Sequence, residues 1–322
     1  MTDFDIVLPV HKKDIDIIEI CLKYLRKNVN NNCNIYIISK NKLTDNAIWI
    51  QENIFPFSFN DISNIIGNHF RTGWYYASLL KLHWFLINGI KNNVLVCDID
   101  TIFIKKTCFF ENNKALFNIS PNDGTPMYNE HMMKLLNIKS QLKNNWSGIT
   151  HHIMMNKQIL LSLIEYVKKK NNNNQPFWKI NLLKTCEKYK TYPVLPSCKN
   201  LKYKHMGPGR WSTYELYCQY ALKYFPDKVK IRKLNSIMAY KGFLNVKNCN
   251  FRPSYPSRTN LQGNVIIISP EKEKEHVFDN LNDCLEFHIE ECIKKNFDSV
   301  TFQNHSREGS GIVTHNSSGD KR

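Results

Sequence analysis

Short apolar runs alternate with helix-spaced segments at the start of the chain. The run Phe4–Val10 predicts a buried strand, and Asn34–Ser39 predicts a second strand after an asparagine-rich turn. Between them, the apolar residues of Ile17–Lys27 recur at helical spacing. A strand, a helix and a strand at this spacing predict a parallel βαβ unit.

A third strand, Asn93–Cys97, follows a long apolar segment. Trp74–Ile90 predicts one helix, and the strand after it ends at Asp98-Ile99-Asp100. The same patterns continue further along. We expect strands at Ala115–Ser120 and Gly148–Asn156, helices at Glu130–Gln141, Lys157–Lys170 and Thr213–Phe225, and extended segments at Tyr192–Tyr203 and Val229–Tyr240.

The character of the chain changes after about Gly242. One more strand is predicted at Val265–Ser269, then a charged amphipathic helix at Glu271–Lys295, and small polar residues dominate from Ser306. We therefore expect an α/β fold. A Rossmann-like domain with a mixed central sheet flanked by helices should span residues 1–245, followed by a small strand-and-helix extension over 246–305 and a disordered tail over 306–322.

The chain is basic: 44 Lys and Arg against 28 Asp and Glu give a net charge of +16. Such a balance favours polyanionic partners, namely nucleic acid, an anionic membrane surface or phosphorylated small molecules. The basic residues are scattered, and no nucleic-acid recognition motif accompanies them. We expect no nucleic-acid partner.

Size and hydropathy fit a soluble protein. The chain has 322 residues, of which 42% are hydrophobic, enough for a large core. Its 10 cysteines show no C-x-x-C spacing, which favours free thiols in a reducing compartment. No apolar run approaches the ~20 residues that a membrane helix needs, and the start of the chain shows no signal-peptide pattern. We expect a cytosolic location and no membrane span; the sequence leaves the oligomeric state open.

The clearest chemical signal is the pair Asp98 and Asp100 at the end of a buried strand. Ligands of α/β sheets bind outside the carboxyl ends of strands, and side chains two residues apart in an extended segment point the same way. Two neighbouring carboxylates repel each other, so one keeps its proton unless a cation intervenes. Mn²⁺ or Mg²⁺ resolves this conflict and bridges to diphosphates. The alternative is a turn with two solvated acids, but the apolar Ile102–Ile104 that follows favours a cation site.

Two enzyme classes place an Asp-x-Asp pair at a strand end. In GT-A glycosyltransferases a metal on the pair holds a nucleotide diphosphate, whereas in haloacid-dehalogenase-type phosphatases the first residue, here Asp98, is a nucleophile. The phosphatase pattern has Thr or Val where this chain has Ile102, and it lies near the chain start. A later acidic pair, Asp279 and Asp283, falls inside a charged helix. The transferase is favoured, and the phosphatase or an inactive glycan- or nucleotide-binding protein stays as the alternative.

The order of features resembles that of GT-A glycosyltransferases over most of residues 4–245. The opening Ile6–His11 is similar to their first strand, whose end contacts the nucleotide base. A helix start at Arg71–Tyr75, a helix carrying Lys81 and then the acidic pair follow in the family's order. The resemblance implies donor contacts at Pro9, Val10, His11, Arg71, Trp74, Lys81, Asp98, Ile99, Asp100 and Arg210.

Within that class the chain looks most like a poorly characterised group from bacteria and large DNA viruses. The group shows a Gly-Trp-Tyr helix start, Asp-x-Asp-Thr, a His-His-Met-type segment and a Glu-Leu-Tyr helix. These motifs correspond here to Gly73–Tyr75, Asp98–Thr101, His151–Met154 and Glu215–Tyr217. The third departs from the pattern, because Ile153 precedes Met154.

Two adjacent histidines, His151 and His152, follow Trp146-Ser147-Gly148. In GT-A enzymes a Ser-Gly-type turn about 50 residues after the acidic pair borders the sugar pocket, so the resemblance places these histidines near the donor sugar or the acceptor. Neighbouring residues of a strand face opposite ways, so at most one faces the pocket. We favour His152.

Another segment, His-Met-Gly-Pro-Gly-Arg-Trp at residues 205–211, is similar to a glycogenin-like motif. The similarity implies that His205 completes the metal shell and that Arg210 holds the diphosphate. A Gly/Pro loop with solvated charges is the alternative.

Glu215 is the favoured catalytic base for an inverting reaction. It stands at a helix start near a Gly-rich loop, where a carboxylate can deprotonate an acceptor hydroxyl. Ser212–Glu215 is also a capping box, which needs no catalytic role. Asp123, in a Pro-Asn-Asp-Gly turn, is the competing candidate.

Together the residues and the resemblance predict a glycosyltransferase that depends on Mn²⁺ or Mg²⁺. Asp98, Asp100 and His205 are the expected metal ligands. The enzyme would move a hexosyl or deoxyhexosyl group from a nucleotide-diphosphate donor, a UDP-sugar being favoured, to a hydroxyl of a glycan or glycoconjugate. If the chain is viral, its location is the host cytoplasm.

Overall fold

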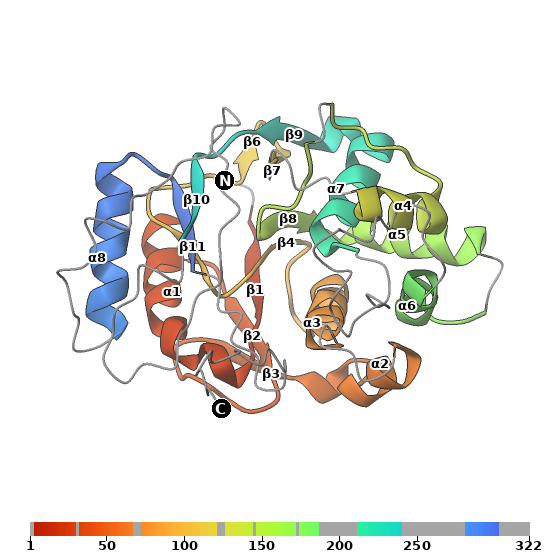
Figure 1. The fold of residues 1–322 in the computed structure, drawn as a ribbon, viewed down its shortest axis with the longest axis horizontal. Coiled ribbons are helices and arrows are strands. Elements are labelled where there is room, and N and C mark those ends of the chain that lie inside the picture. Colours follow the sequence, from red (N-terminus) through yellow and green to blue (C-terminus); the bar gives the residue numbers. More distant parts are fainter. Residues whose placement is uncertain are drawn as a thin grey trace, which may run out of the picture.

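A mixed five-stranded sheet forms the centre of the protein (Figure 1). The computed structural model describes residues 3–29, 32–66, 72–120, 126–143, 146–171, 174–186, 211–239 and 281–302. The strand order is β3-β2-β1-β4-β8; the first four strands run parallel and the last is antiparallel. These strands are β1 (Asp5–Pro9), β2 (Ile35–Ser39), β3 (Ile48–Gln51), β4 (Asn93–Cys97) and β8 (His152–Asn156).

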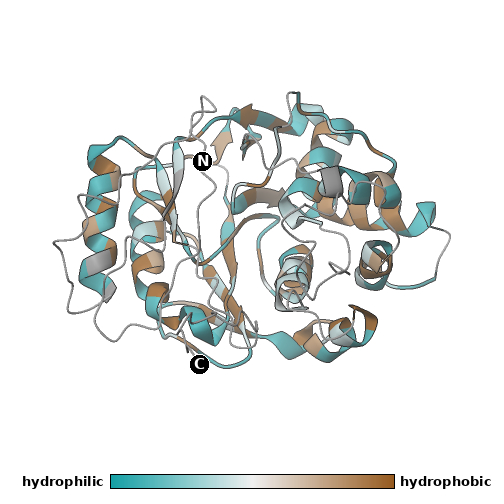
Figure 2. Cartoon of the chain, in the orientation of Figure 1, coloured by the Kyte–Doolittle hydropathy of each residue, from teal (hydrophilic) through white to brown (hydrophobic). Residues whose placement is uncertain are grey.

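Helices cover both faces of this sheet. One face carries α1 (Ile15–Asn28), and α8 (Leu281–Lys294) packs on α1 from outside. The helices on the other side are α2 (Phe59–Ile66), α3 (Thr72–Leu82), α4 (Pro126–Leu136), α5 (Lys157–Lys170), α6 (Phe177–Cys186) and α7 (Thr213–Tyr224) (Figure 1). Strand alternation divides the core in two: Ile6 and Leu8 pack with α1, whereas Val7 packs with α3. Figure 2 shows the strands largely in brown and the helices two-sided. The predicted α/β class with a mixed sheet between helices is confirmed, including the first βαβ unit.

Two small sheets lie beyond the central one. The first has the order β10-β11-β5, formed by β10 (Ser236–Ala239), β11 (Ser299–Phe302) and β5 (Thr101–Phe103). The second has the order β6-β7-β9, formed by β6 (Phe110–Glu111), β7 (Lys114–Asn118) and β9 (Val229–Arg232). Strand β5, which directly follows the acidic pair, is paired antiparallel with β11. The C-terminal residues 299–302 therefore belong to the same body as the candidate site.

The helix expected over Trp74–Ile90 is shorter in the structure. It begins at Thr72 and ends at Leu82, and a 3₁₀ turn follows at Trp84–Leu86. The ring of His83 lies 2.8 Å from the Leu79 carbonyl, and Trp84 is fully buried. Burial of these side chains has overridden the helical periodicity.

Residues with a left-handed backbone conformation explain two other differences between the expected and the observed elements. The helix expected over Glu130–Gln141 ends at Leu136, because Asn137 has a φ of 58°. The strand expected from Gly148 begins only at His152, because His151 has a φ of 61°.

Several predicted segments lie outside the described residues. They are the strand Val265–Ser269, the extended Tyr192–Tyr203, the domain boundary at 245/246 and the tail from 306. Among the helices that are described, not one has both the length and the apolar character needed to cross a bilayer.

Candidate functional site

The acidic pair lies at the carboxyl end of β4, at the centre of the sheet. Because β4 pairs in parallel with β1, the segment after Pro9 lies at the same end of the strands as the acidic pair. The turn is closed by a hydrogen bond from the Thr101 amide to the Asp98 carbonyl (3.1 Å). The Phe302 amide of β11 donates to the Asp100 carbonyl at 2.8 Å, which fixes the second residue from the far side.

Asp98 is held by three side chains: one from α3, one from α7 and one from the residue before β8. Its Oδ1 forms an ion pair with Lys81 of α3 and accepts a hydrogen bond from the Tyr214 hydroxyl of α7 at 2.8 Å. Its Oδ2 lies 3.1 Å from Nδ1 of His151. Burial alone would raise the pKa of Asp98, but the charges of Lys81 and His151 hold it well below its usual range. Asp98 is therefore a carboxylate at neutral pH.

Asp100 has the opposite character. Its Oδ1 is buried and has no hydrogen-bond partner among the described residues. Burial and the negative charge of Asp98 raise the pKa of Asp100 from 3.8 to about 7. Asp14, just after the first strand, is affected in the same way. Burial raises its pKa to about 6; the negative charge of Asp98 adds to this rise, and the positive charge of Lys13 opposes it. Burial and the negative charge of Asp98 thus disfavour ionisation of both Asp100 and Asp14.

This donor set fits a divalent cation. An unpartnered buried carboxylate oxygen beside a second, ionised carboxylate is the oxygen-rich environment that Mg²⁺ and Mn²⁺ favour. Within the described ranges, no group of three or more His, Cys, Asp or Glu side chains is placed so that it could hold a metal ion. His205, the expected third ligand, lies outside those ranges, as do Arg71, Asp123 and Arg210.

The histidine assignment made from strand alternation needs correction. His152 is 3% exposed and packs edge-on against Phe103 and Phe109. His151, not His152, contacts Asp98, because its left-handed backbone turns the side chain toward β4. The strand begins after His151, so the alternation rule did not apply to it.

Glu215 is placed as a support of the neighbouring turn. Its side chain is buried, with Oε2 accepting from the Gly148 amide at 2.6 Å and Oε1 accepting from Gln219 Nε2 at 2.9 Å. The Ser212 hydroxyl caps the helix by accepting from the Glu215 amide, so one half of the predicted capping box is present. Only Gly fits at 148, because a Cβ there would lie 2.6 Å from the Cys218 Cβ. A carboxylate held in this way favours positioning over proton abstraction.

The expected donor-binding residues divide into groups. Lys81 lies in the site, and its ammonium lies 4.8 Å from the centre of the Tyr214 ring. Pro9 ends β1 beside the acidic pair, and Val10 follows it. His11 is exposed, and one of its ring nitrogens accepts from the Lys13 amide. Two others belong to packing instead: Ile99 is buried in the core, and Trp74 is half-buried against Tyr75 and Trp211.

Tyr214 and Asp14 were missed by the sequence reasoning. Tyr214 stands one position before Glu215 in a helix whose pattern indicates only burial, and Asp14 follows two lysines in a polar loop. Tyr214 reaches Asp98 across 116 positions of the chain, a contact that no local pattern encodes.

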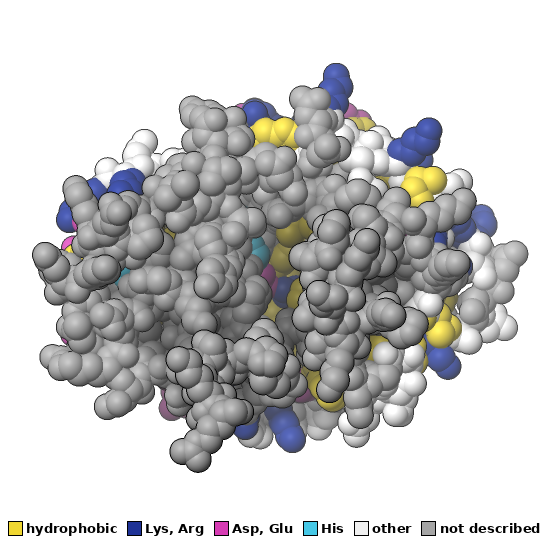
Figure 3. Space-filling view, viewed as in Figure 1, with side chains coloured by type: hydrophobic (Ala, Val, Ile, Leu, Met, Phe, Trp, Pro, Cys, Tyr) yellow, Lys and Arg dark blue, Asp and Glu magenta, His cyan; other side chains and the backbone are white. Residues whose placement is uncertain are grey.

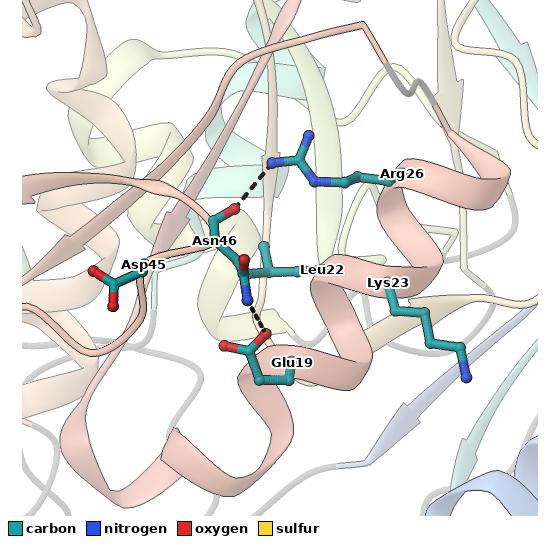
Figure 4. A pocket seen from close by; sticks show the side chains of 6 residues that line it. All are labelled: Glu19, Leu22, Lys23, Arg26, Asp45 and Asn46. Carbon is teal, nitrogen blue, oxygen red and sulfur yellow. Dashed lines mark hydrogen bonds between the residues drawn. The ribbon is translucent and has the colours of Figure 1, made fainter.

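Figure 3 shows His, acidic and Lys side chains together near the middle of the visible face, in the region that β4 occupies in Figure 1. A separate hollow of about 460 Å³ lies between α1 and the loop before β3 (Figure 4). Glu19 accepts there from Asn46, and Arg26 donates to the Asn46 carbonyl. The acidic pair is not part of its lining.

Comparisons with known proteins gave matches among solved structures only. No protein-family model matches the chain, and no curated protein does. A galactosyltransferase, LgtC, in complex with donor and acceptor sugar analogues matches with a TM-score of 0.34 and 11% identity, over 55% of this chain and 68% of LgtC. The mannosyltransferase Ktr4p of S. cerevisiae matches with a TM-score of 0.43 and 11% identity, over 71% of this chain and 67% of Ktr4p. Because both TM-scores are below 0.5, the function proposed for this chain rests on its site residues.

Proposed function

We propose that the chain is a divalent-cation-dependent glycosyltransferase that uses a nucleotide-sugar donor, a UDP-sugar being favoured. The observation that carries this proposal is the acidic pair at the end of β4, where Asp98 is ionised and Asp100 presents an unpartnered oxygen. The resemblance of the motif order to GT-A glycosyltransferases supports a nucleotide-sugar as the ligand. Mn²⁺ and Mg²⁺ are the cations that these oxygen ligands favour.

The residues have separate tasks in this proposal. Asp100 and Asp98 would hold the cation, which when bound supplies positive charge that stabilises the diphosphate leaving group. Lys81, Tyr214 and His151 hold Asp98 in one orientation through both of its oxygens. The edge after Pro9 lies beside this pair and is the proposed place of the nucleotide. Glu215 keeps the Gly148 turn in position.

The placement of the later acidic pair disfavours the phosphatase alternative. Asp283 of the later acidic pair is exposed on α8, which packs on α1. Its partner Asp279 lies outside the described residues.

Turnover of nucleotide-sugars tests the proposal. Purified protein is incubated with a panel of UDP- and GDP-sugars and Mn²⁺, and released nucleoside diphosphate is measured by chromatography. We expect at least one donor to be hydrolysed or transferred, with the rate reduced about 100-fold or more in Asp100→Asn. Asp227→Asn, at an exposed position, is the matched control and should keep the wild-type rate.

Two results contradict the proposal. Hydrolysis of simple phosphoesters through a trapped phospho-Asp98 would assign the chain to the phosphatases. Binding of nucleotide-sugars without turnover, for every donor and with added glycan acceptors, would assign it to the inactive binding proteins.

A further inference from the structure

Arg232 ends β9 with its guanidinium half-buried. Its Nε donates to Asn118 Oδ1 at 2.8 Å, its Nη1 donates to the Cys108 carbonyl, and its Cζ lies 5.0 Å from the centre of the Phe109 ring. Asn118 and Arg232 are register partners at the carboxyl ends of the parallel strands β7 and β9. Both oxygen partners of the guanidinium are neutral.

The guanidinium has no counter-ion among the described residues. No carboxylate there forms an ion pair with Arg232, and its Nη2 is buried without a hydrogen-bond partner. Asp298 acts on it only at longer range, and that carboxylate accepts from the Asn235 amide at 2.8 Å. Burial lowers the pKa of Arg232 to about 10, against the opposing charge of Asp298. Because buried cations in proteins are normally paired, a missing anion is the simplest explanation.

The position of Arg232 connects it to the acidic pair. Asn118 Oδ1 accepts from the donor-only guanidinium, so its Nδ2 faces Nε2 of His152. His152 directly follows His151, which contacts Asp98. The positive charge of Arg232 also contributes, after burial, to the lowered pKa of His152. Arg232 is thus connected to the acidic pair through Asn118 and the His151–His152 dipeptide.

A second cation stands next to Arg232. Lys233 is exposed, and its ammonium lies 4.5 Å from the centre of the Trp146 ring, beside the turn that Gly148 ends. A guanidinium, an ammonium and an aromatic ring are groups that recognise an anionic carbohydrate or phosphate.

We propose that Arg232 anchors an anion-binding subsite that takes a phosphate or carboxylate group of a substrate. This subsite adds a binding group to the proposed glycosyltransferase site, and the identity of its substrate rests on that proposed function. The anion has two possible sources: the diphosphate of the donor, or a charged group on the acceptor glycan. The guanidinium would bind either anion in the same way. Measuring the affinity of the variants for UDP distinguishes the two sources.

The test uses inorganic phosphate, without metal or sugar, titrated into the full chain and followed by calorimetry. Arg232→Gln removes the charge. Asn118→Asp leaves the arginine in place and supplies the missing counter-charge beside it. Lys230→Gln, on the same strand and exposed, is the matched control, because Lys230 is already paired with Glu111. Thermal unfolding of each variant reports whether it folds.

We expect the Kd for phosphate to rise about tenfold or more in Arg232→Gln and Asn118→Asp and to stay unchanged in Lys230→Gln. If the affinity for UDP with Mn²⁺ falls in parallel, the anion is the donor diphosphate; if it does not, the anion belongs to the acceptor. Unchanged phosphate binding in folded Asn118→Asp and Arg232→Gln, or no phosphate binding by the wild type, overturns the proposal. These results are independent of donor turnover, so they separate failure of the subsite from failure of the proposed function.

Discussion

Replacing Asp100 by Asn should stabilise the metal-free protein at alkaline pH. Asp100 has a pKa raised from 3.8 to about 7, so in the folded state it holds a proton that the unfolded chain releases. Titration of Asp100 therefore does not affect the free energy of unfolding below pH 3.8, and it lowers that free energy increasingly as the pH rises to about 7. The difference between those pKa values corresponds to about 4 kcal/mol, which solvent screening at this half-buried group reduces to ~2 kcal/mol.

The assay is urea unfolding in the presence of EDTA at pH 4 and pH 8. We expect Asp100→Asn to exceed the wild type in free energy of unfolding by ~2 kcal/mol at pH 8 and to be close to it at pH 4. Asp227→Asn is the exposed control and should not show this difference. Equal stabilities at pH 8, or the same gain at both pH values, would refute the reasoning that burial and Asp98 destabilise the Asp100 carboxylate.

Three other substitutions test the surroundings of the pair. Lys81→Met should raise the pKa of Asp98 and cost ~3 kcal/mol of stability at pH 7, because the buried carboxylate loses its ion pair; urea unfolding against pH measures both. Gly148→Ala should cost about 1–3 kcal/mol, since its Cβ would meet Cys218 at 2.6 Å, and equal thermal stability would contradict this packing. Phe302→Pro removes the amide that donates to the Asp100 carbonyl and should weaken Mn²⁺ binding measured by electron paramagnetic resonance; unchanged Mn²⁺ affinity in a folded variant would show that β11 does not position Asp100.

The sequence was sufficient for the features that depend on neighbours in the chain. The strand before Asp98 is an apolar run, and the two acids follow it directly. Their position at the carboxyl end of this strand could therefore be predicted. The parallel βαβ unit followed from the same kind of pattern. Edge strand β3 and helix α6 were not predicted: β3 is mostly exposed, and the apolar residues of α6 do not gather on one side.

The rest of the site depends on contacts between distant segments. Gly148 and Glu215 meet across 67 positions, and Asn118 and Arg232 across 114. The choice between His151 and His152 depended on one backbone angle, the φ of 61° at His151. Strand alternation does not predict the direction of the His151 side chain, because that residue precedes β8.

The most direct test of the central claim is the binding of UDP to the wild-type protein and to Asp100→Asn, with and without Mn²⁺, by calorimetry. We predict that Mn²⁺ tightens UDP binding at least tenfold in the wild type and leaves it unchanged in Asp100→Asn. Binding of UDP that ignores Mn²⁺ in both proteins, or no UDP binding at all, would contradict the assignment of Asp98 and Asp100 as a cation-dependent nucleotide-sugar site.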